Sequence, residues 1–142
     1  MAEGILRDKF KQLNYSGTVD SAGFESFHIG DTADARAILT MQNKGVDITD
    51  HVARLFTVED FDLFDRIYVM DYYHYTNVGQ LSRTEEDMEK VDYIMNVISP
   101  GRNEPVKDPW YDGMNSFEKV YKQLHQACTL LAERITTGAP LK

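Results

Sequence analysis

The sequence is poor in cysteine and in basic residues and has no long apolar run, and each shortage excludes a class of protein. The single cysteine, Cys128, can form neither an internal disulfide nor a multi-cysteine metal site, which favours a reducing cytoplasm. Lysine and arginine number 15 against 23 aspartate and glutamate residues. The resulting formal net charge of -8 repels a phosphate backbone, so we expect no nucleic-acid partner. No stretch of about 18 apolar residues is present, so we expect no association with a membrane.

Metal and nucleotide patterns are also missing. His28, His51, His74 and His125 lie far apart and form no pair at i and i+4, so no metal site is predicted. The nine glycines are dispersed and form no phosphate loop of the Walker or Rossmann kind. We therefore expect a protein that works without a cofactor.

The composition is that of an ordinary folded domain, with 42% hydrophobic and 27% charged residues in a chain of 142. We expect one domain over residues 1–135 and a loose C-terminal tail over residues 136–142. Helical spacing of apolar residues predicts helices over 2–14, 32–44, 58–63 and 116–135, with two more that begin near 71 and 84. Strands are predicted over 18–22, 65–70 and 91–98, with a short edge near 55–57.

This alternation predicts an α/β fold with three layers, in which helices flank a small, mostly parallel sheet. Three strands are few for such a sheet. A parallel sheet of this kind normally begins with a strand whose loop leads into the first helix, whereas this chain begins in a helix. We therefore expect that an N-terminal strand and its loop are missing.

The long loop over residues 99–115 contains the most informative cluster, in which Asp108 is followed by Pro109, Trp110 and Tyr111. A carboxylate beside two large aromatic rings could be partly desolvated and hold a proton near neutral pH, as a general acid does. The alternative is an Asp-Pro turn with exposed aromatic side chains. Cys128, in the last predicted helix, is expected to be a small buried hydrophobe rather than a nucleophile.

Residues 108–111, together with Phe117 and Val120, resemble the Asp-Pro-aromatic loop and the final helix of the low-molecular-weight protein tyrosine phosphatases. The resemblance covers nearly the whole chain in order and spacing. The other matching segments are Val19–Gly23, Gly30 with Asp34 and Arg36, His51–Arg54, Asp60 with Phe61, Phe64 with Asp65, and Met70 with Asp71.

The resemblance implies a parallel sheet of four strands in the order 2-1-3-4. It also implies a catalytic loop, Cys-x5-Arg-Ser-Pro, that connects the first strand to an Ala-Glu pair at the start of the first helix. Here the chain begins Met1-Ala2-Glu3. We therefore expect that the first strand, the nucleophilic cysteine and the phosphate-binding arginine are absent, through truncation or an internal start codon, and that the chain as written is inactive.

The resemblance assigns roles to the residues that remain. Asp108 matches the general acid that protonates the leaving group and later activates water. Trp110 and Tyr111 match one aromatic wall of the substrate cleft, and Phe27 matches the opposite wall. The implied substrate is a phosphotyrosine-containing protein or a small aryl phosphate.

Ser21 and His51 match residues that hydrogen-bond the catalytic loop and hold its shape. An alternative function is a non-catalytic remnant that binds a partner protein through the aromatic wall. Arsenate reductases share this fold, but the resemblance implies additional resolving cysteines in them, and Cys128 stands alone.

The implied position of the first strand also predicts a folding problem. It lies between the strands near Val19 and Tyr68, so its loss leaves two strand edges facing an empty slot. Each buried, unpaired backbone group costs ~1 to 3 kcal/mol, against a total stability of ~5 to 15 kcal/mol. We therefore expect a poorly folded chain, or one that fills the slot by closing the gap, by refolding its tail or by strand exchange in a homo-oligomer.

Overall fold

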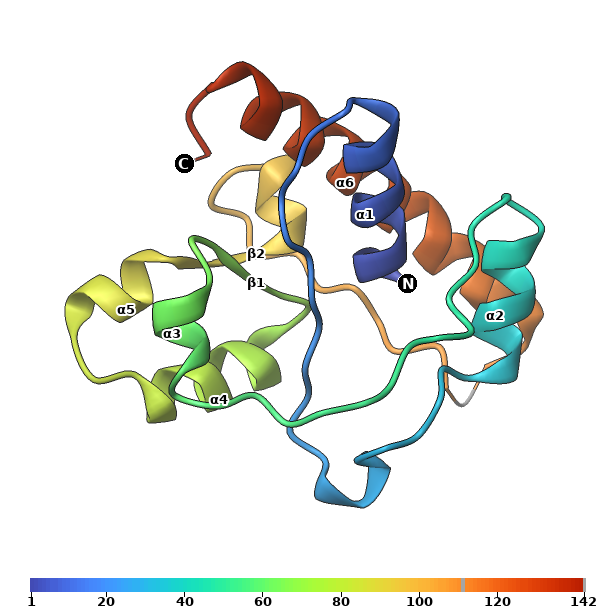
Figure 1. The fold of residues 1–142 in the computed structure, drawn as a ribbon. Coiled ribbons are helices and arrows are strands. Elements are labelled where there is room, and N and C mark those ends of the chain that lie inside the picture. The colour runs from blue at the N-terminus through green and yellow to red at the C-terminus, as the bar shows by residue number, and fades with distance from the viewer. Residues whose placement is uncertain (111, 142) are drawn as a thin grey trace.

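Two short parallel strands form the regular sheet in the computed structural model, which describes residues 1–110 and 112–141 (Figure 1). Strand β1 (Ile67–Val69) pairs with β2 (Val91–Tyr93), and Tyr68 lies opposite Asp92. The two strands are joined by two helices, so the connection is the crossover that parallel pairing requires.

Helices make up most of the remaining regular structure. They are α1 (Ala2–Gln12), α2 (Ala35–Gln42), α3 (Asp60–Leu63), α4 (Tyr72–Leu81), α5 (Glu85–Glu89) and α6 (Met114–Thr137), with 3-10 turns η1 (Ser26–His28) and η2 (Ile94–Val97). Asp71 caps α4 by accepting the His74 N–H, and Thr84 caps α5 by accepting the Asp87 N–H. The helices predicted to begin near 71 and 84 are therefore confirmed, and Gly138 ends α6 in the left-handed conformation, at φ 73°.

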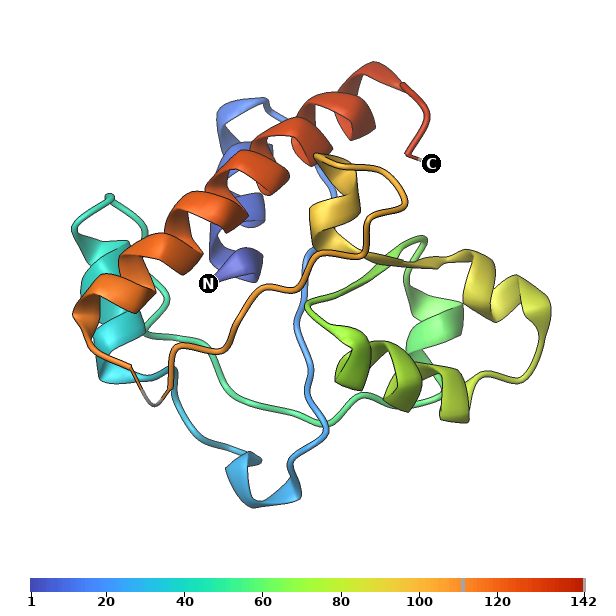
Figure 2. The same ribbon diagram turned by 180° about the vertical axis from the view of Figure 1, so that it is seen from behind.

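Two apolar clusters lie on opposite sides of the sheet. One joins α1, α2 and α6, and its buried residues include Ile5, Met41, Leu124 and Leu131. The other contains Phe61 of α3 together with buried side chains from both strands and from α4. Figures 1 and 2 show α3, α4 and α5 on the side of the strands away from α1 and α6. The expected α/β layering around a small parallel sheet is confirmed.

Two predicted strands differ in the structure. Residues 18–22 form no strand, and their nearest regular pairing is a single bridge between Gly23 and Leu55, which is also what remains of the predicted edge near 55–57. A strand needs a neighbour to complete its hydrogen-bond ladder, and the side of this segment that faces β1 borders a cleft. The strand predicted over 91–98 ends at Tyr93, because the buried apolar run that follows forms the turn η2.

Candidate active site

The loop that carries Asp108 is attached to the carboxyl end of β1. The N–H of Val106 donates to the carbonyl of Met70 at 2.8 Å, directly after the strand. Ligand sites of open parallel sheets lie at the carboxyl ends of the strands. The Asp108 carboxylate is exposed and accepts the N–H of Trp110 at 2.9 Å, so it forms an Asx turn. The expected partial desolvation of Asp108 is not found in this structure.

Aromatic side chains from two distant segments meet beside this loop. Phe27, on η1, is 74% exposed, and Trp110 is 47% exposed. The ring of His28 lies between them, with its centroid 4.3 Å from that of Phe27 and 5.8 Å from that of Trp110. Sequence reasoning placed Phe27 and Trp110 on opposite walls but gave His28 no role. Tyr111, expected in the same wall, lies outside the described residues.

Ser21 and His51 are brought together by Glu3, in the first turn of α1. The Ser21 hydroxyl donates to Glu3 Oε1 at 2.8 Å, and His51 Nδ1 lies 3.9 Å from the same oxygen. Arg7, one turn later, holds Glu3 Oε2 at 3.1 Å. Sequence reasoning missed Glu3 as a site residue, although the Ala-Glu pair at the start of the helix was part of the resemblance.

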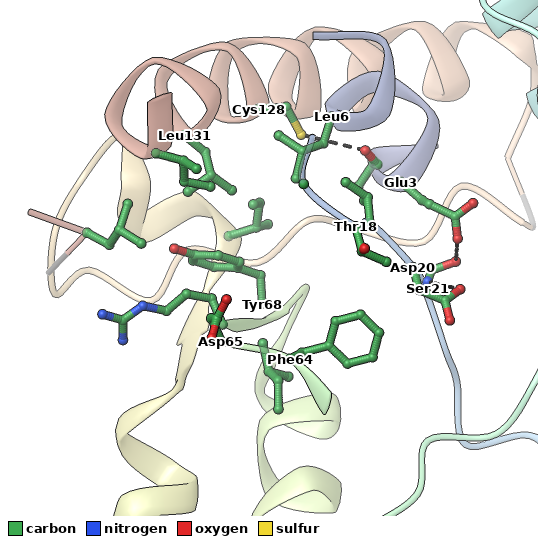
Figure 3. A pocket seen from close by; sticks show the side chains of 18 of the residues that line it. Glu3, Leu6, Thr18, Asp20, Ser21, Phe64, Asp65, Tyr68, Cys128 and Leu131 are labelled. Carbon is green, nitrogen blue, oxygen red and sulfur yellow. Dashed lines mark hydrogen bonds between the residues drawn. The ribbon is translucent and has the colours of Figure 1, made fainter. Parts of the chain in front are cut away.

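A cleft of about 910 Å³ lies between α1, α6, β1 and the extended segment that contains residues 18–22 (Figure 3). Leu6, Cys128 and Leu131 line the wall formed by the helices, and Tyr68 lines the wall formed by the strand. Residues 138–141 of the C-terminal tail line part of it, and Leu141 packs against the larger apolar cluster. The cleft lies where the resemblance places a further strand.

Within residues 1–110 and 112–141, the strand β1 pairs only with β2, so its edge beside this cleft is free. The N–H of Ile67 donates to Lys90 on the β2 side. Because successive residues of a strand direct their backbone groups to alternate sides, the N–H and C=O of Tyr68 point toward the cleft. Phe24, which follows the extended segment, stacks on His74 in α4, with ring centroids 6.1 Å apart.

Cys128 is buried, as expected, with 1% of its surface exposed and its Sγ 3.8 Å from the carbonyl oxygen of Ala2. Burial raises the pKa of this thiol to about 12. Cys128 and Arg134 have the Cys-x5-Arg spacing, but both lie inside α6, where backbone N–H groups bond within the helix. This spacing therefore forms no phosphate cradle.

The other histidines each have a local neighbour. His28 Nδ1 lies 3.1 Å from Asp31, His74 Nδ1 lies 3.1 Å from Asp71, and the ring of His125 stacks on Tyr121. Within residues 1–110 and 112–141, no three His, Cys, Asp or Glu side chains are grouped so as to hold a metal ion. In the same part of the chain, no helix combines the length and the apolar character needed to cross a bilayer.

The fold defines a class, namely an α/β protein in which exposed aromatic side chains and the loop that carries Asp108 lie at the carboxyl end of a parallel strand. The sequence pattern of the family described as low molecular weight phosphotyrosine protein phosphatase matches residues 1–139. The chain therefore belongs to the low molecular weight phosphotyrosine protein phosphatase family.

Individual relatives agree with this assignment. The chain is 33% identical over 140 residues to low molecular weight phosphotyrosine protein phosphatase 1 of Drosophila melanogaster, covering 95% of this chain and 88% of the relative. It is 31% identical over 127 residues to the Schizosaccharomyces pombe phosphatase, covering 87% and 80%. A crystal structure of an Entamoeba histolytica protein tyrosine phosphatase superposes with a TM-score of 0.88 at 26% identity, covering 96% and 88%. None of these similarities supports the alternative of a non-catalytic remnant.

Proposed function

We propose that this protein hydrolyses phosphotyrosine and other aryl phosphate monoesters in the cytoplasm, without a cofactor. The family match over residues 1–139 carries this proposal. The position of the Asp108 loop beside Phe27 and Trp110 supports it, because a phenyl ring held between two aromatic walls presents its ester oxygen near a carboxyl group. The partner is then a phosphotyrosine-containing protein or a small aryl phosphate.

Asp108 acts as general acid and base in this proposal. A thiolate from a Cys-x5-Arg loop attacks phosphorus, the bond from phosphorus to the phenolic oxygen breaks, and Asp108 donates its proton to that oxygen. In the second step Asp108 takes a proton from water, the water oxygen attacks phosphorus, and the sulfur–phosphorus bond breaks to release phosphate and the thiolate. Ser21 and His51, joined through Glu3, hold the shape of the loop.

We propose further that the 142 residues by themselves do not perform this reaction. Their one cysteine is buried and has a pKa of about 12, so at neutral pH the thiolate that must attack phosphorus is scarcely populated. The reaction needs a thiol whose pKa is lowered and a loop that binds phosphate, as the Cys-x5-Arg-Ser-Pro loop implied by the resemblance would provide.

The test compares two proteins in para-nitrophenyl phosphate hydrolysis, namely the 142-residue chain and the same chain preceded by a strand and loop of the family pattern. We expect turnover only in the second protein. Turnover by the 142 residues that is abolished in Cys128→Ser would overturn both the inactivity and the structural role of Cys128.

The role of Asp108 is tested in the loop-bearing protein. Asp108→Ala should slow turnover by roughly 10² to 10⁴ with a phenolic ester of high leaving-group pKa. Asp71→Asn is the matched control, because Asp71 also lies at the carboxyl end of β1 but caps α4, a contact that asparagine preserves. A loss below threefold in Asp108→Ala would show that another group is the acid.

A further inference from the structure

Arg36 connects two segments that are distant in the sequence. It lies in the first turn of α2, where Asp34 caps the helix by accepting the N–H of Arg36 at 2.8 Å. The guanidinium then returns to the same carboxylate, with Nε 3.1 Å from Oδ1 and Nη2 3.0 Å from Oδ2. This bidentate pair fixes the plane and direction of the guanidinium.

The remaining donors of Arg36 reach the loop that carries Asp108. Nη2 donates to the carbonyl of Trp110 at 2.7 Å, and Nη1 donates to the carbonyl of Asp112 at 2.8 Å. These hydrogen bonds span 74 and 76 residues of sequence. The first part of the loop is therefore held by the bond from Val106 to Met70, directly after β1, and its second part is held by Arg36 in α2.

Aromatic rings complete the surroundings of Arg36. Its guanidinium carbon lies 4.7 Å from the ring centroid of Phe117 in α6 and 5.8 Å from that of Trp110. A planar, delocalised cation stacks on such rings, whereas the ammonium of lysine is a point charge without the fork geometry. The position is therefore specific for arginine.

We propose that the Asp34–Arg36 pair positions the loop that carries Asp108. It holds the backbone carbonyls of Trp110 and Asp112 so that Asp108 and Trp110 face the substrate. The proposal rests on the proposed function for its catalytic meaning, since Arg36 touches the loop and not the reacting atoms. The restraint on the loop itself is measurable without catalysis.

Trp110 is the only tryptophan, so its fluorescence reports the state of this loop in the 142-residue protein as it exists. In Arg36→Gln the carbonyls of Trp110 and Asp112 lose their charged donor, and the Trp110 ring loses the cation beside it. Since 47% of Trp110 is already exposed, full release of the ring raises its acrylamide quenching constant by about twofold at most. We expect an increase toward this limit, together with a lower fluorescence anisotropy.

Matched variants separate the restraint from general loss of structure. Arg83→Gln removes another arginine that pairs with two carboxylates, Asp62 and Asp87, neither of which belongs to the loop, and it should leave the Trp110 signal unchanged. Arg36→Lys keeps the charge but not the fork, so its quenching should stay above that of the wild type. A wild-type signal in Arg36→Lys would overturn the role of the fork.

Unchanged quenching and anisotropy in Arg36→Gln would overturn the proposal. If far-UV circular dichroism shows that this variant is unfolded, Asp34→Asn is tested in its place. This variant keeps Arg36 and removes only the carboxylate that orients the guanidinium. Increased quenching in Asp34→Asn supports the proposal, and an unchanged signal refutes it. Failure of the phosphatase assay would leave these fluorescence results untouched, so the two proposals fail separately.

Discussion

Two leucines of α6 test whether the cleft beside β1 exists in solution. Leu124 and Leu131 are 3% and 1% exposed and belong to the same apolar cluster. Leu131 lines the cleft, whereas Leu124 does not. The same substitution, leucine to alanine, therefore removes the same atoms from two environments that differ in packing.

The expected costs depend on how far the space left by the removed side chain can be refilled. Leu124 does not line the cleft, so its substitution leaves an enclosed cavity, and Leu124→Ala should cost ~3 to 5 kcal/mol. The space left at Leu131 borders the cleft, so neighbouring side chains have room to move into it. Leu131→Ala should therefore cost ~2 to 3 kcal/mol, at the lower end of the range for buried leucines.

Urea unfolding followed by far-UV circular dichroism measures both costs, with m-values to verify that each transition remains comparable. The difference between the variants should be about 1 to 2 kcal/mol in favour of Leu131→Ala. An equal or larger cost at Leu131 would refute the reasoning, because it would mean that the cleft is filled in solution. Unfolding midpoints that rise with protein concentration would identify a second copy as the occupant.

Four further predictions concern packing, pH and association. Gly4→Ala should lower the unfolding free energy, because a Cβ at this position lies 2.5 Å from Ile48 Cγ2. The cost of overpacking, ~1 to 3 kcal/mol, exceeds the ~1 kcal/mol gained in helix propensity. Gly79→Ala has no neighbour nearer than 3.8 Å and should stabilise the protein by ~0.5 to 1 kcal/mol in the same urea assay. Stability should fall as pH rises from about 9 toward 12. Burial raises the pKa values of the Cys128 thiol and the Tyr68 hydroxyl to about 12, so the unfolded chain loses these two protons at lower pH than the folded chain does. Alkaline titration of the melting temperature checks this, and a flat profile above pH 9 would contradict it. The free edge of β1 predicts self-association that sedimentation velocity detects, and a monomer at every concentration would argue against it.

The sequence by itself determined the features that depend on neighbouring residues. Asp71 and Thr84 marked the starts of α4 and α5, because a cap satisfies backbone donors only three residues away. The apolar spacing of the last helix and the burial of Cys128 were also predicted, since both follow from one periodic face. The motifs that resemble the phosphatase family identified Asp108, and its role stays a prediction.

The tertiary structure alone decided the features that join distant segments. Residues 18–22 have the composition of a strand, but a strand exists only where a neighbour completes its ladder, and there the structure has a cleft. Glu3 joins Ser21 and His51, and Arg36 binds the carbonyl of Asp112 across 76 residues. Backbone carbonyls are present at every position, so no sequence pattern specifies which of them a distant arginine will bind.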